Sequence, residues 1–181
     1  MSVGDSIRKN LHFWHWYPRL ICEGLTEEQL HWQPDKNPNH ITFALWHAYR
    51  SEDEIIHQLL IQGPSLFQTG GWAERLPVAN PGTPPFGTGL NREEIARVHL
   101  PLEAIIEYAE AVGRKIQAYA DTLSDEDGAV DVPLPFFAGI YPLESASRIE
   151  VLNFFCIGHT AEHLGEVQYI KGLLGLKGAP L

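Results

Sequence analysis

Two histidines and a glutamate recur at one-turn intervals in the C-terminal part of the chain. His159 and His163 are four residues apart, and Glu166 follows one further turn along. On a helix these three side chains would project from one face. Two imidazoles at this spacing can converge on one divalent ion at the roughly 2 Å ligand distance of zinc. Glu166 could be a fourth ligand, a partner that orients an imidazole, or a general base.

The residues around this group are apolar, which bears on whether it binds a metal. Read in alternating steps of four and three, the expected inward face of the helix is Leu152, Cys156, His159, His163, Glu166, Ile170 and Leu173. Two imidazoles and a carboxylate in such a setting need partners, because burying them bare costs several kcal/mol. The alternative to a metal ion is a pair of core histidines that are hydrogen-bonded to the protein.

The motif between the two histidines also matches a known peptidase signature. Residues His159 to His163 spell H-x-x-E-H, the pattern of the inverted zinc peptidases. Those enzymes take a further carboxylate ligand from a helix well downstream, and too few residues follow His163 to supply one. The peptidase interpretation is therefore poor.

A metal site inside a helical bundle needs at least one ligand from another helix. The candidates are His47, at the edge of the apolar stripe of the second long helix, and His12 or His15 on the first. An edge position suits a ligand beside a cleft, yet the residues alone do not select His47 over His15. The remaining histidines are expected to be solvated. His31, His40 and His99 fall in loops or at helix ends, and His57 lies on the polar side of the second helix.

Helical periodicity, with apolar residues at intervals of three and four, runs through four long segments. We expect them at Val3–Glu23, Ile41–Gln62, Asn91–Leu123 and from Ser147 to near Gly175. Pro18 should kink or shorten the first helix, and Pro101 should interrupt the third. Glu52 is the one charged residue on the apolar seam of the second.

Capping patterns and breaker residues mark where these helices begin and stop. Capping pairs are expected at Thr26 with Gln29, Asn91 with Glu94 and Ser147 with Glu150. Two stretches rich in Gly and Pro or in turn residues, Gly63–Gly89 and Ser124–Pro142, have no clear period. The sequence thus predicts one all-α domain over residues 1–181, a four-helix bundle with long Gly/Pro-rich crossover loops. The first crossover carries Phe67, Trp72 and Phe86, either as a substrate lid or as ordinary packing of the bundle end.

Charge and cysteine usage bound the class of protein. The formal net charge is -10 with no Lys/Arg cluster, so nucleic-acid binding is not expected. Cys22 and Cys156 sit in apolar helical stretches, which indicates free buried thiols in a reducing compartment. Neither a signal-peptide core nor a bilayer-length apolar run is evident, so we expect a cytoplasmic protein without a membrane partner.

Several short motifs, in this order and spacing, resemble the DinB-like superfamily, also called YfiT-like metalloenzymes. The motifs are Leu25-Thr-Glu-Glu-Gln-Leu, Pro34, Asn39-His-Ile, Leu45-Trp-His47, Glu52, Gly158-His159, His163 and Gly165-Glu-Val-Gln-Tyr-Ile-Lys-Gly172-Leu. The resemblance covers nearly the whole chain. It implies a four-helix bundle with an unusual connection order, often homodimeric, in which His47, His159 and His163 hold one divalent ion, nickel or zinc. Glu52 matches a glutamate that family members often carry five residues after the first ligand.

The resemblance also suggests a reaction. It implies a thiol-dependent S-transferase, in which a small-molecule thiol attacks an electrophilic substrate. The alternative from the chemistry of the site is hydrolysis of a small ester or amide, with Glu166 or Glu52 as the catalytic carboxylate that handles protons. A third interpretation is a non-catalytic metal-binding dimer that acts in a stress response.

Overall fold

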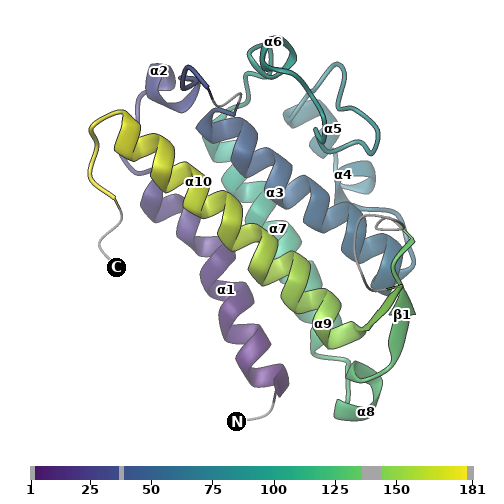
Figure 1. Cartoon of the computed structure of the whole chain (residues 1–181). Helices are drawn as coiled ribbons and strands as arrows, with labels where there is room; N and C mark the ends of the chain where they lie inside the picture. Colours follow the sequence, from purple (N-terminus) through teal and green to yellow (C-terminus); the bar gives the residue numbers. More distant parts are fainter. Residues whose placement is uncertain (1–2, 37–38, 136–143, 179–181) are drawn as a thin grey trace.

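The computed structural model describes residues 3–36, 39–135 and 144–178. It confirms the helical class. Its long helices are α1 (Val3–Ile21), α3 (Ile41–Ile56), α7 (Leu102–Ala120) and α10 (Thr160–Leu173). The main contacts run from α1 to α7, α7 to α3, α3 to α10 and α10 back to α1, with α10 in front and α7 behind (Figure 1). The helices that carry His47 and the C-terminal histidine pair are therefore neighbours.

Short helices, π-helical stretches and a small β-ribbon connect the long helices within the described residues. The short helices are α2 (Glu27–Leu30), α4 (Leu66–Thr69), α5 (Trp72–Arg75), α6 (Arg92–Ile95), α8 (Asp125–Gly128) and α9 (Arg148–Leu152). The π-helical stretches η1 (His57–Ile61) and η3 (Asn153–His159) continue α3 and precede α10. Strands β1 (Asp131–Pro133) and β2 (Ser145–Ser147) pair antiparallel, with Val132 opposite Ala146. Ser124–Pro142 is therefore not entirely irregular, and its residues 136–142 lie outside the described part.

The helix starts follow the local chemistry of the sequence. Capping boxes at Thr26, Asn91 and Ser147 begin α2, α6 and α9 as predicted, and each satisfies backbone N–H groups that the first turn leaves free. Pro101 precedes α7, so the third helix restarts there. The first helix does not end at Pro18, and α1 continues through this residue to Ile21.

The inward face of the C-terminal helix differs from the predicted one. The buried residues include Leu152, Cys156, Thr160, Leu164, Val167 and Ile170, whereas Leu173 is 47% exposed. His159 and His163 are half-buried and lie beside this stripe. The reason is η3, because a π turn contains more residues than an α turn and so shifts the phase of the helix.

Buried charge on α3 ties the first crossover to the helix. Asp53 is fully buried, and its carboxylate accepts hydrogen bonds from the backbone N–H groups of Leu66 and Phe67 and from the Tyr108 hydroxyl. The His57 ring lies 2.9 Å from the same carboxylate. His57 is 2% exposed, so its predicted place on a polar face was wrong.

The aromatic residues of the first crossover pack inward. Trp72 and Phe86 are buried, and Phe67 packs against the core from its edge. Both cysteines, Cys22 and Cys156, are free and buried, as expected. Within the described residues, no helix combines the length and hydropathy that a bilayer crossing requires.

Candidate metal centre

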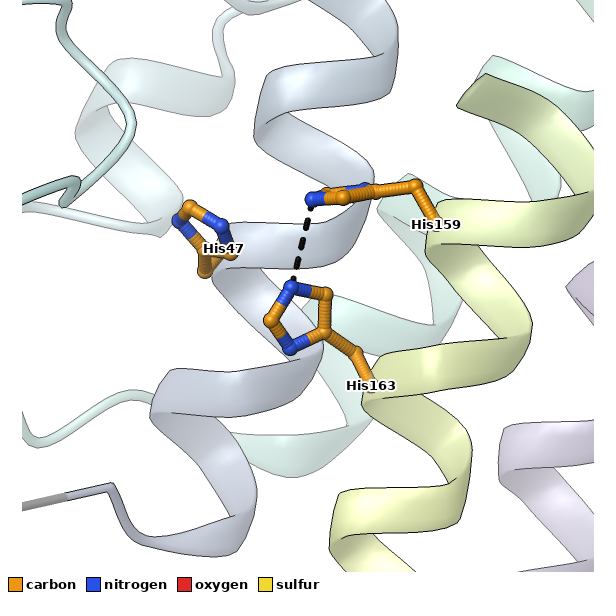
Figure 2. A group of neighbouring side chains, drawn as sticks. All are labelled: His47, His159 and His163. Atoms are coloured by element: carbon orange, nitrogen blue, oxygen red, sulfur yellow. Dashed lines mark hydrogen bonds between the residues drawn. The ribbon is translucent and has the colours of Figure 1, made fainter. Parts of the chain in front are cut away.

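Three histidines converge between α3 and α10. His47 points from α3 toward His159 and His163, which extend from the junction of η3 and α10 (Figure 2). One ring nitrogen from each lies within 4.8 Å of the others. Among the described residues, these three histidines are the one cluster of His, Cys, Asp or Glu side chains close enough to hold a metal ion together.

A backbone carbonyl in the first crossover orients the ring of His47. Its Nδ1 is hydrogen-bonded to the carbonyl oxygen of Phe86, which can only accept. Nδ1 therefore carries the proton, and a neutral ring leaves the Nε2 lone pair free. The Phe43 ring stacks on the same imidazole, with centroids 6.2 Å apart.

A carboxylate and an amide orient the ring of His163. Its Nδ1 lies 3.1 Å from Oε2 of Glu166, and Nδ2 of Asn39 donates to Oε1 of the same carboxylate at 2.8 Å. The carboxylate thus lies against the nitrogen remote from the cluster. Such a partner fixes the tautomer of a ligating histidine and leaves Nε2 as the donor atom.

The spacing of the pair on the last helix fits one ion. Nε2 of His159 and Nε2 of His163 are hydrogen-bonded to each other at 3.2 Å (Figure 2). Two nitrogens bound to one tetrahedral zinc ion lie about 3.3 Å apart. Nδ1 of His159 is buried and has no hydrogen-bond partner within the described residues, so this nitrogen does not hold its ring in one tautomer.

The electrostatics of the site favour neutral imidazoles. Burial and the neighbouring His163 ring lower the pKa of His47 to about 4. Burial and the rings of His163 and His47 lower the pKa of His159 to about 3. Neutral rings present lone pairs, which is the protonation state that metal binding requires.

Glu52 and His15 form a separate polar pair in the core. Glu52 is 0% exposed, and its oxygens are bonded to Nε2 of His15 at 3.0 Å and to the Thr160 hydroxyl at 3.2 Å. Nδ1 of His15 is bonded to the Leu11 carbonyl at 2.7 Å. Burial opposes a charge on His15, but the Glu52 carboxylate outweighs it and raises the pKa of His15. With both nitrogens on acceptors, His15 has no lone pair to offer a metal.

The predicted exposure of the other histidines is confirmed for some of them and wrong for others. His12 is exposed and outside the three-histidine group. His99 is exposed as expected, whereas His31 is half-buried. His40 is 1% exposed, so its predicted solvation was wrong: its Nδ1 caps α3 by accepting from the Phe43 N–H, and Nε2 is bonded to the Ile95 carbonyl.

Two supporting groups of the site were missed in the sequence. Nothing local to Phe86 indicates that its carbonyl reaches His47, because the two residues are 39 positions apart in the sequence. Asn39 was noted only as part of a motif. Its position next to His40, the N-cap of α3, could have suggested a role at the end of the bundle, but not its contact with Glu166.

Comparisons with known proteins agree with the helical architecture. The family model described as the DinB superfamily matches residues 19–167. Among solved structures, the chain is similar to the crystal structure of a conserved protein from Enterococcus faecalis, with 19% sequence identity and a TM-score of 0.78 over 97% of this chain and 99% of that chain. At this identity the likeness indicates a shared fold and carries no conclusion about activity. The search of curated proteins finds no match.

Proposed function

The chain belongs to the DinB superfamily, and from that premise we propose that it is a metal-dependent enzyme with the four-helix-bundle frame expected from the sequence. One divalent ion, nickel or zinc, is held by His47, His159 and His163. The observation that carries the proposal is the convergence of three ring nitrogens within 4.8 Å on two neighbouring helices. The hydrogen bonds to Phe86 and Glu166 support it, because they turn a lone pair of two of these rings inward.

We propose that the reaction is transfer of a small-molecule thiol to an electrophilic substrate. Three neutral ligands leave the charge of a divalent ion intact, and such an ion lowers the pKa of a coordinated thiol or water. Glu166 holds the His163 ring in the ligating tautomer. Glu52 was a second candidate for proton transfer, but its carboxylate is enclosed by His15 and Thr160, and we propose that it joins α1, α3 and α10 instead.

The first experiment is metal analysis of the protein purified without added metal. Wild type should contain about one nickel or zinc ion per chain, and His47→Ala, His159→Ala and His163→Ala should each lose most of it. His12→Ala, which removes an exposed imidazole outside the site, is the matched control and should keep the ion. Equal metal content in wild type and the three site variants would contradict the proposal.

The second experiment distinguishes the reaction classes. The metal-loaded protein is screened for conjugation of mycothiol, bacillithiol and glutathione to small electrophiles, and for hydrolysis of small esters and amides. Conjugation that disappears in His159→Ala supports the transferase. Hydrolysis without conjugation would favour a hydrolase, and inactivity in both screens a metal-binding stress-response protein.

We further propose a cytoplasmic homodimer, as the family resemblance implies. Tyr169 is 62% exposed and Leu173 is 47% exposed on the outer side of α10, which gives that helix apolar surface for a partner copy. Sedimentation of wild type beside a Tyr169→Ser, Leu173→Ser double variant tests this arrangement. A monomeric wild type would contradict the dimer, and a variant that stays dimeric would contradict the use of this face.

A further inference from the structure

The ring of His159 is held differently from the other two rings of the candidate metal centre. Nδ1 of His47 is bonded to the Phe86 carbonyl, and Nδ1 of His163 is bonded to Glu166. Nδ1 of His159 is buried and has no such partner within the described residues. Its Nε2 is bonded to His163, which belongs to the same centre. The place of this ring therefore depends on the backbone that carries it, at the last residue of η3.

The register of the helix decides where that backbone directs the ring. On an ideal α-helix, His159 would lie about 20° around the axis from Leu152, and Thr160 about 80°. In the structure Thr160 shares the buried stripe with Leu152, whereas His159 is half-buried beside it. The π-helical turn thus brings Thr160 to the core position that uniform α geometry would give to His159.

The hydroxyl of Thr160 is bonded to two oxygens at this core position. It lies 3.2 Å from Oε2 of Glu52 and 3.2 Å from the carbonyl oxygen of Phe155. Both oxygens are acceptors, so the hydroxyl proton is shared between a carboxylate of α3 and a carbonyl inside η3. Glu52 is fully buried, and its other oxygen lies 3.0 Å from Nε2 of His15. The carboxylate that meets Thr160 is therefore itself held in place.

A second side chain of the same stripe meets this carboxylate. Burial, the charge of Glu52 and a hydrogen bond to Glu52 raise the pKa of the Cys156 thiol well above its ordinary value, so the thiol stays neutral. Glu52 thus contacts one residue within η3, Cys156, and the residue directly after it, Thr160. Because π-helical turns are rare, the α register is ordinarily the favoured one, and contacts on both sides of the last π residues stabilise the exception.

We propose that the hydrogen bond between Glu52 and Thr160 holds η3 in its π-helical register and thereby positions His159 in the metal centre. The bond ties the residue after His159 to α3, the helix that also carries His47. Without the hydroxyl, the segment relaxes toward α geometry, which directs His159 to the core. Glu52 and Thr160 are positioning residues, since neither is one of the three ligands. The effect on metal binding rests on the proposed function, whereas the effect on η3 does not and can be measured in metal-free protein.

The first measurement concerns η3 alone. Thr160→Val removes the hydroxyl at nearly constant volume, and Thr160→Ser keeps it. In metal-free protein, hydrogen–deuterium exchange over residues 153–160 should be about tenfold faster in Thr160→Val than in wild type. In Thr160→Ser it should stay within about threefold of wild type, because the donor is retained.

The second measurement, metal affinity, reports the position of His159. In competition with a chromophoric chelator, Thr160→Val should bind zinc about tenfold more weakly than wild type, and Thr160→Ser within about threefold of it. The matched control is Thr42→Val, which removes a buried hydroxyl bonded to His40 at the start of α3. This control should leave zinc affinity and the exchange of residues 153–160 within about twofold of wild type.

The possible outcomes separate this proposal from the proposed function. Equal exchange over residues 153–160 in wild type and Thr160→Val, or an equal acceleration in Thr42→Val, would overturn the role in the register. Equal zinc affinity of wild type and Thr160→Val would overturn the positioning of His159 and leave the proposed function standing. A wild type that binds no metal would contradict the proposed function, and the exchange measurement then decides the register by itself. If Thr160→Val does not fold, Thr160→Ala, with its higher helix propensity, takes its place.

Discussion

Replacing Asp53 by asparagine should destabilise the protein strongly, because four donors converge on this one carboxylate. Oδ1 accepts from the Leu66 N–H at 3.0 Å and lies 2.9 Å from Nδ1 of His57. Oδ2 accepts from the Phe67 N–H at 2.8 Å and from the Tyr108 hydroxyl at 2.6 Å. Asp53 is 0% exposed, so water cannot replace any of these contacts.

The size of the effect follows from the geometry of the amide. Asparagine retains one acceptor oxygen and presents an NH₂ group where the other oxygen was, so in either orientation two donors face a donor. An unsatisfied buried donor costs about 1–3 kcal/mol, and the hydroxyl of Tyr108 can rotate to accept, which reduces the sum. We expect Asp53→Asn to lower the free energy of unfolding by about 2–4 kcal/mol, a large part of the roughly 5–15 kcal/mol of a typical domain.

Urea unfolding of metal-free protein, followed by circular dichroism, measures this change. The control is Asp121→Asn, which removes a half-exposed carboxylate bonded to Arg8 and should alter stability by less than about 0.5 kcal/mol. The hydrogen bonds to Asp53 outweigh its burial and lower its pKa, so its contribution is present above about pH 4 and is lost as pH falls through the folded pKa. An Asp53→Asn protein as stable as wild type, with the same acid sensitivity, would refute this reasoning.

Three further predictions concern the metal centre and the core. Glu166→Gln should weaken metal binding about tenfold, measured in competition with a chromophoric chelator, whereas the exposed control Glu162→Gln should leave it unchanged. Equal metal affinities of wild type and Glu166→Gln would contradict the role of Glu166 in orienting His163. Gly113→Ala would place a Cβ 2.6 Å from the His15 ring and should cost about 1–3 kcal/mol, whereas Gly165→Ala meets nothing within 4 Å and should be neutral or stabilising in the same urea assay. Burial lowers the pKa of His15, but the Glu52 carboxylate outweighs burial and raises it. The stability that this pair contributes is therefore complete below about pH 6.5 and is lost as pH rises through the folded pKa. An NMR titration of metal-free protein that gives His15 a pKa at or below about 6.5 would exclude the charged pair.

The helix boundaries were predictable because they depend on contacts within one turn. The capping boxes at Thr26, Asn91 and Ser147 need only a side chain and the backbone three residues away, and all of them form. The break before α7 follows from Pro101 in the same way.

Features that depend on helix phase or on distant partners were not predictable. The prediction of the inward face of the last helix assumed uniform α geometry. The π-helical stretch η3 shifts the helix phase, so that Thr160 lies in the core and Leu173 at the surface. His40 looked like a solvated residue at a helix end. Its second nitrogen is satisfied by the Ile95 carbonyl, more than fifty residues away, and no local pattern indicates that contact.

The choice of the third histidine shows why the residues alone left the site open. His15 and His47 are both single imidazoles near the apolar side of a long helix, and either could have faced the pair on the last helix. His15 has an acceptor at each nitrogen, the Leu11 carbonyl and the Glu52 carboxylate, so both of its nitrogens are engaged within the core. The described contacts of His47 give it one such acceptor, the Phe86 carbonyl, and its second nitrogen faces the other two rings. The hydrogen-bond acceptors around each ring therefore decide which histidine is free to bind a metal. Glu52 bears on this choice because it engages His15, the other candidate for the third ligand.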